Sequence, residues 1–122
     1  MKISVRLGEA QFEKSTKLTL NLSEVQICQG RFIIVQCGDQ KFQSSTEKTS
    51  TPQFSDCFSI NIVPSQRPMI LFEYYETFIV KSSVYKAFVI IETNHLSYNK
   101  DVSQWIEFSN GGRLFVTLRL CN

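Results

Sequence analysis

The sequence has no long hydrophobic run. Within its 122 residues there is no stretch of about eighteen apolar residues, the length that a membrane-spanning helix needs. A secretory signal is also missing, because residues 1–7 alternate polar and apolar side chains instead of forming a continuous apolar segment. These absences favour a domain of the reduced cytoplasm.

The common motifs of catalysis and metal binding are absent as well. His95 is the only histidine, and the four cysteines, Cys28, Cys37, Cys57 and Cys121, form no C-x-x-C pair, so we expect no structural zinc site. No G-x-S-x-G, H-E-x-x-H or P-loop pattern provides a nucleophile with its base and orienting acid. The sequence therefore predicts no enzyme activity, no cofactor and no metal.

No block of like charge occurs. Thirteen basic and eleven acidic residues are spread along the chain, and the net charge is +2. Binding to nucleic acid normally needs a concentrated basic face, because affinity grows with the number of phosphates that are neutralised. We therefore expect no nucleic-acid partner.

What the sequence does have is alternation with a period of two. Apolar and polar side chains alternate through residues 3–7, 18–22, 57–62 and 113–120. This pattern is typical of strands with one face on a core and the other in water.

Three denser apolar runs, residues 32–35, 69–72 and 88–91, are typical of central strands. Gly38-Asp39 and Asn110-Gly111-Gly112 are hairpin signals between strands. Short strands with frequent turns predict an all-β fold, an antiparallel β-sandwich of eight or nine strands. We expect one domain over residues 1–122, which would be the N-terminal domain of a longer protein.

The segment Thr49–Ile60 has a threonine, a proline three residues on, an aromatic residue two after that, then an acidic residue and alternating apolar positions. This pattern resembles the middle of a C2 domain. Upstream, Leu18–Leu22 and Gly30–Val35 resemble the first core strand of that family and the strand that follows its first loop. The resemblance covers residues 17–120, which leaves Ile3–Leu7 as an added or permuted first strand.

Further along, Ile70–Glu76 and Val84–Ile91 resemble the strands that bracket the third calcium loop of a C2 domain. The stretch from Trp105 to Leu114 resembles the tryptophan-containing end of that family. We expect Trp105 to plug one end of the core.

The calcium site that the resemblance implies has lost its ligands. Calcium is held by six to eight oxygens, and several carboxylates must converge to provide them. Gly30 stands where the family has its first-loop aspartate, and the third-loop segment offers only Glu76, with Glu73 or Asp56 as distant helpers. The lysine-rich strand of the family corresponds to residues 40–44, which hold one lysine, Lys41. We therefore expect calcium-independent binding.

Two kinds of contact residue remain as candidates. The apolar side chains after residue 77 would protrude from a loop toward a partner or a bilayer, unless the strand runs longer and they pack inside. Basic residues would assist them if the loops converge, unless they are simply solvated. These candidates are Phe78, Ile79, Lys41, Lys48, Arg67, Lys81 and Lys86.

The leading hypothesis is a non-catalytic, calcium-independent protein-interaction or scaffold module of a larger cytoskeletal or trafficking protein. Its partner would be another protein or a second copy of the chain. The alternative is a calcium-independent peripheral membrane domain that binds anionic phospholipid. Both hypotheses predict a cytoplasmic location, with association to the cytoskeleton or to a membrane.

Overall fold

The computed structural model describes residues 1–12, 17–21, 24–63, 65–78 and 83–122. The described residues contain no helix, and so none that is long and apolar enough to span a membrane. Their ten strands are β1 (Lys2–Gln11), β2 (Lys17–Asn21), β3 (Glu24–Ile27), β4 (Gly30–Cys37), β5 (Gln40–Gln43), β6 (Cys57–Asn61), β7 (Met69–Thr77), β8 (Val84–Glu92), β9 (Asp101–Glu107) and β10 (Arg113–Cys121).

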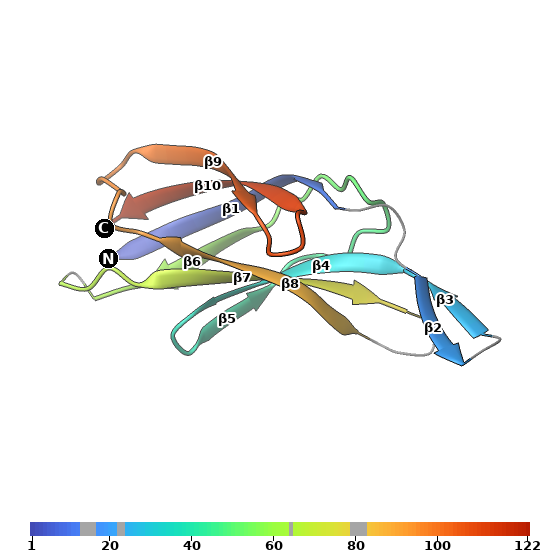
Figure 1. Cartoon of the computed structure of the whole chain (residues 1–122). Helices are drawn as coiled ribbons and strands as arrows, with labels where there is room; N and C mark the ends of the chain where they lie inside the picture. The colour runs from blue at the N-terminus through green and yellow to red at the C-terminus, as the bar shows by residue number, and fades with distance from the viewer. Residues whose placement is uncertain (13–16, 22–23, 64, 79–82) are drawn as a thin grey trace.

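Eight of these strands form two four-stranded sheets that pack face to face (Figure 1). The first sheet has the order β6-β1-β10-β9 and the second the order β5-β4-β7-β8. Neighbouring strands in both sheets are antiparallel. The predicted antiparallel sandwich is therefore confirmed, and β2 and β3 form a separate two-stranded ribbon in addition to it.

The first strand is central to the fold. β1 pairs with β10 on one side and with β6 on the other, so that Lys2 lies opposite both Cys121 and Asn61. Of the two predicted alternatives for Ile3–Leu7, an added or a permuted first strand, this central position excludes an added edge strand and fits a permuted one. The prediction that Leu18–Leu22 is the first core strand was wrong. Residues 18–21 belong to the β2–β3 ribbon, which lies outside both sheets (Figure 1), and Leu22 is outside the described residues.

The core lies between the inner faces of the two sheets. Alternate residues of β1 and β10 point into it and are almost fully buried, because each strand has one face on the other sheet and one in water. The largest fully buried apolar side chains are Phe54, Phe72, Ile3, Leu7, Ile33, Ile60, Ile70, Leu114, Leu118 and Leu120. Their contacts across the layers make one contiguous core.

The two glycine turns lie where the sequence predicts them. Gly38, between β4 and β5, has a φ of 59°, and Gly111, between β9 and β10, has a φ of 92°. Positive φ is readily adopted only without a β-carbon, which is why glycine stands at these two positions.

Two predictions about apolar residues fail. The run at residues 88–91 lies in β8, which is an edge strand and not a central one. Its side chains point alternately inward and outward, and the outward Phe88 and Ile90 are exposed. Trp105 does not plug the core, because its side chain lies on the outer face of β9 with 40% of its surface exposed. There it makes an edge contact with the Phe115 ring at 5.4 Å.

Candidate interaction surfaces

At one end of the sandwich, the start of β4 lies beside the end of β7 and beside the segment after β5. Gly30 pairs with Thr77, and Arg31 exchanges two backbone hydrogen bonds with Glu47 at 2.6 and 2.8 Å. A β-carbon on Gly30 would lie 2.6 Å from Cγ2 of Thr46, so this close approach of the backbone requires glycine. We call this region the loop end.

A buried ion cluster lies just inside the loop end. Glu76 of β7 is 0% exposed, and its carboxylate lies 3.7 Å from Nε of Arg31 on β4 and 3.5 Å from Nζ of Lys86 on β8. The Tyr74 hydroxyl donates a hydrogen bond of 2.9 Å to the same carboxylate. Arg31 also donates from Nη1 to the carbonyl of Lys48 at 2.9 Å, so that the cluster connects three strands and the 44–48 segment.

The cluster leaves no negative charge to attract a metal ion. Arg31 and Lys86 together outweigh the single carboxylate of Glu76 by one positive charge. Asp56, expected as a distant helper, accepts hydrogen bonds from the backbone and side chain of Ser45. Among the described residues no three acidic, histidine or cysteine side chains come together in a group that could hold a metal ion.

Burial and the charge of Glu76 raise the pKa of two neighbouring groups. Desolvation raises the pKa of the Cys28 thiol, and the Glu76 carboxylate raises it further. The pKa of Tyr74 is raised well above its usual value, first by burial and then by the same carboxylate. Both groups therefore stay protonated and neutral at physiological pH.

Phe78 does not protrude as an apolar loop contact. Its side chain, directly after the end of β7, is 4% exposed, which agrees with the alternative that it packs inside. Ile79 and Lys81, the other two predicted loop contacts, lie outside the described residues.

The remaining basic candidates do not converge on one patch. Lys48 and Lys86 lie at the loop end, where Lys86 is engaged by Glu76. Arg67 precedes β7 and donates to the carbonyl of Leu96, so the nine-residue strand β7 separates it from the loop end by roughly 30 Å. Lys41 pairs with Gln36, which also lies toward that far end. An anionic surface would therefore contact only one or two of these basic side chains at a time.

The structure instead exposes an apolar surface that sequence reasoning missed. Outward side chains of the neighbouring strands β7 and β8 form it, and we call it the β7–β8 outer face: Met69, Leu71, Tyr75, Tyr85, Phe88 and Ile90. Met69 is 60% exposed, Ile90 50%, Tyr85 46% and Phe88 43%. These four are among the most exposed large apolar side chains of the described residues.

Aromatic contacts link this face to β4, where Phe32 itself is buried. The rings of Phe32 on β4 and Tyr75 on β7 stack at 5.2 Å, and Tyr85 on β8 meets Tyr75 edge-on at 5.7 Å. Glu73 lies between Tyr75 and Met69 along β7 and is the one acidic residue in the middle of the face. Cross-strand partners such as Leu71 and Ile90 form this face.

The open edge of β8 is partly closed by the turn after β9. The backbone N–H of Phe88 donates to Oγ of Ser109 at 3.2 Å, and the N–H of Ser109 donates to the carbonyl of Phe88 at 2.9 Å. Since backbone groups two residues apart point the same way, Ile90 directs its N–H and carbonyl to the same open side. The edge therefore offers hydrogen-bonding groups next to the apolar face.

Comparison with known proteins gives a fold and no closer relative. No protein-family model matches the sequence, and no curated protein matches it. The structure is similar to human GIVD cytosolic phospholipase A2 in complex with methyl gamma-linolenyl fluorophosphonate, with a TM-score of 0.78 and 18% identity over 99% of this chain. The chain spans only 17% of the length of that phospholipase.

Two other similar structures consist of C2 domains. A C2 domain of plant extended synaptotagmin 1 matches 97% of this chain with a TM-score of 0.78 and 12% identity, and 92% of its own length is covered. The calcium-bound pair of C2 domains of extended synaptotagmin 2 matches 97% of this chain with a TM-score of 0.78 and 15% identity, over 44% of its length. With two four-stranded antiparallel sheets in the same arrangement, the chain is a C2-like domain.

Proposed function

We propose that this chain is a non-catalytic, calcium-independent protein-interaction module that binds its partner through the β7–β8 outer face. The observation that carries the proposal is the exposure of Met69, Tyr85, Phe88 and Ile90 on two neighbouring strands. Contiguous apolar patches of several hundred Å² are unusual on isolated domains and mark interaction sites.

The free energy available from this face is sufficient for binding. A phenylalanine side chain buries about 200 Å², so covering the 43% of Phe88 that is exposed removes roughly 90 Å² from water. At about 25 cal/mol per Å², that contributes about 2 kcal/mol. Met69, Tyr85 and Ile90 have similar or larger exposed fractions, so together they form a compact group of anchor residues.

The edge of β8 determines where and in which orientation a partner strand could bind. Hydrogen bonds to the free backbone groups at Ile90 would let a partner strand extend the sheet while its side chains cover the apolar face. The turn at Ser109 blocks the middle of the edge. We therefore expect augmentation at the Ile90 end of β8 and not along its whole length.

Calcium independence is proposed from the buried ion cluster. Arg31 and Lys86 already neutralise Glu76 and leave a net positive charge where a cation would have to bind. The similar domains of extended synaptotagmin 2 are calcium-bound in their structure, so this chain would differ from them in how the loop end works.

We further propose a cytoplasmic location within a larger scaffold, trafficking or cytoskeletal protein. All four cysteines are free thiols, as the reduced cytoplasm keeps them. The corresponding region of the human phospholipase is a small part of a longer chain. Anionic membrane binding is less well supported, because Phe78 is buried and the described basic candidates are dispersed.

The test is partner capture by the full-length protein in its own cells, with EGTA in the lysis buffer. The double variant Phe88→Ser/Ile90→Ser is compared with wild type and with Val63→Ser, a control whose apolar side chain is 55% exposed in the loop between β6 and β7. We expect the same partner with wild type and Val63→Ser and at least about a tenfold loss with the double variant, which corresponds to about 1.4 kcal/mol or more.

Two outcomes contradict the proposal. One is a partner that the double variant retains in full. The other is sedimentation of the wild-type chain with phosphatidylserine liposomes in EGTA, abolished by added salt, which would establish the membrane alternative. Analytical ultracentrifugation of the isolated chain reports whether the partner is a second copy, and in that case the double variant is monomeric where wild type dimerises.

A further inference from the structure

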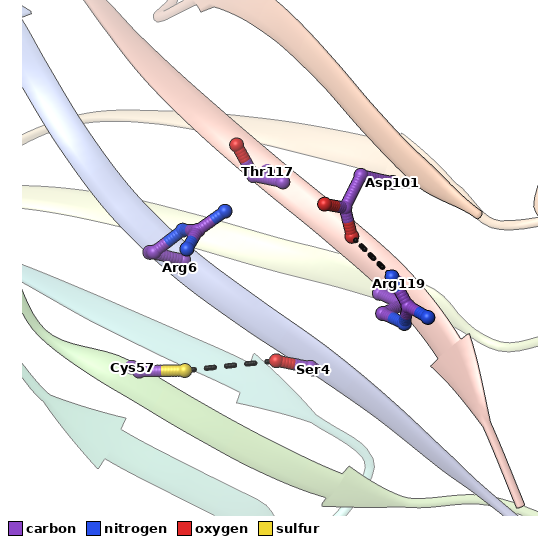
Figure 2. Close-up of a pocket in the computed structure, with 6 residues that line it drawn as sticks. All are labelled: Ser4, Arg6, Cys57, Asp101, Thr117 and Arg119. Atoms are coloured by element: carbon purple, nitrogen blue, oxygen red, sulfur yellow. Dashed lines mark hydrogen bonds and ion pairs between the residues drawn. The ribbon is translucent and has the colours of Figure 1, made fainter. Parts of the chain in front are cut away.

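A second surface, which is polar, lies on the outer face of the sheet β6-β1-β10-β9. Six side chains from all four of its strands surround a shallow hollow of about 230 Å³: Ser4, Arg6, Cys57, Asp101, Thr117 and Arg119 (Figure 2). A water molecule needs only roughly 15 Å³ of such space. The hollow therefore has room for a ligand group larger than a single water.

The register of the strands places two arginines side by side in this hollow. Ser4 on β1 lies opposite Arg119 on β10, and Arg6 lies opposite Thr117, so Arg6 and Arg119 are diagonal neighbours on one face. Side chains in that relation are within reach of one another when they are long. Two guanidinium groups can thus approach the same ligand.

The two arginines differ in how they are held. Arg119 donates from Nη1 to Oδ1 of Asp101 at 3.2 Å, and both side chains are nearly half exposed. Arg6 is exposed and makes no side-chain hydrogen bond or ion pair to another described residue. Because a guanidinium has five N–H donors, Asp101 can orient Arg119 while leaving donors free for an anion.

The charge and the hydroxyl groups select the class of ligand. Two arginines against one carboxylate leave one positive charge in the hollow, and the β6 side contributes only the neutral Cys57. The Ser4 hydroxyl lies 3.6 Å from Sγ of Cys57 and the Thr117 hydroxyl 2.9 Å from Oγ of Ser103, and each can donate to a ligand oxygen when it accepts in that contact. We infer that this hollow binds a phosphate monoester carried on an extended protein segment.

A protein segment fits this face better than a membrane does. Asp101 and Glu107 stand exposed along the edge strand β9, each opposite an arginine of β10, so acidic and basic side chains are mixed along this face. On the same face the exposed Trp105 and the half-buried Phe115 form an aromatic shelf. Phe115 lies four residues before Arg119 on β10, a separation of roughly 13 Å, so an extended ligand could place an apolar side chain there, four residues from its phosphate.

This inference is independent of the proposed function, because the two surfaces lie on different sheets. The first measurement is a titration of the ¹⁵N-labelled chain with inorganic phosphate at constant ionic strength, followed by NMR. We expect the largest shifts at Ser4, Arg6, Thr117 and Arg119. Arg6→Gln and Arg119→Gln should each weaken binding about fivefold or more, the loss of one charge-assisted hydrogen bond.

Two further variants make the test sharper. Asp101→Asn should strengthen phosphate binding, because it removes the competing carboxylate and frees donors of Arg119. Lys41→Gln changes the net charge by the same amount as Arg6→Gln but lies on the other sheet, so it should have no effect. An amide spectrum of each variant shows that it is folded.

The source of the phosphate is tested with three probes. Two are extended peptides of the same sequence, with a serine and a leucine four residues apart, one phosphorylated on the serine and one not, and the third is neutral vesicles with phosphatidylinositol 4,5-bisphosphate. We expect the phosphopeptide to bind more tightly than inorganic phosphate and the unphosphorylated peptide not to bind. Three results overturn the inference: shifts spread evenly over all lysines and arginines, an equal loss in Lys41→Gln, or binding to the vesicles without binding to the phosphopeptide.

Discussion

Replacing Arg31 by methionine tests the buried ion cluster directly. The substitution keeps most of the apolar stem but removes the guanidinium that lies 3.7 Å from the Glu76 carboxylate and donates to the Lys48 carbonyl at 2.9 Å. Glu76 is 0% exposed, so water cannot replace the lost charge. Among the described residues, Lys86, the Tyr74 hydroxyl and the neighbouring Cys28 thiol remain beside the carboxylate.

The expected loss is a large part of the stability of a domain of this size. Breaking a buried pair by removing one partner costs about 3–5 kcal/mol. Because Lys86 stays in place, we expect the lower end, about 3 kcal/mol of a total that is typically about 5–15 kcal/mol. The melting temperature should fall by about 10 °C.

Urea denaturation at pH 7 measures the change, with Arg113→Met as a control. Arg113 is an exposed arginine whose guanidinium lies 4.7 Å from the centre of the Trp105 ring, so its loss should cost less than about 1 kcal/mol. The double variant Arg31→Met/Glu76→Leu removes the carboxylate as well and should be more stable than Arg31→Met alone. A loss below about 1 kcal/mol for Arg31→Met, or a double variant with the summed loss of both single variants, would refute the reasoning.

Three further results are expected. Gly30→Ala should destabilise the chain by about 1–3 kcal/mol in urea denaturation, because its β-carbon would lie 2.6 Å from Cγ2 of Thr46, and an unchanged midpoint would contradict the packing of the loop end. The raised pKa of Tyr74 keeps it protonated in the fold while the same group ionises near pH 10 in the unfolded chain, so the contribution of Tyr74 to stability should be complete below about pH 10 and be lost above it. Tyr74→Phe should make that alkaline fall shallower in urea titrations at pH 7 to 11, and an equally steep fall would exclude Tyr74 as its source. Ile90→Ser should change the free energy of unfolding by less than about 0.5 kcal/mol, since its side chain is 50% exposed, and a larger loss would mean that the side chain belongs to the core.

The strands of the sandwich could be predicted because their residues face the core and water in turn. The alternation in Lys2–Gln11 and Arg113–Cys121 is local, and it indicated both strands. Their pairing was not predictable in the same way, because β1 pairs with residues at the other end of the chain. The sequence therefore predicted no strand order, and the structure places the first strand centrally and the ribbon at residues 17–27 outside the sheets.

The β7–β8 outer face escaped prediction for a related reason. A continuous apolar run such as Phe88–Ile91 looks the same in a central strand as in an edge strand with one apolar face in water. Only the sheet order shows that β8 is an edge.

The buried position of Glu76 had a signal in the sequence. Glu76 lies on the same side of β7 as Ile70, Phe72 and Tyr74, because alternate residues of a strand point the same way. Its carboxylate therefore has to face the core together with these apolar residues. Its neutralisation by Arg31 was not predictable, since the two residues come from strands that are distant in the sequence.

Hydrogen–deuterium exchange of the chain with its captured partner, in EGTA and again in calcium, tests the proposed binding face most directly. We expect binding to slow exchange in β7 and in the Ile90 end of β8, to the same extent in both buffers. Slowed exchange confined to the loop end, or present only when calcium is added, would contradict a calcium-independent contact through the β7–β8 outer face.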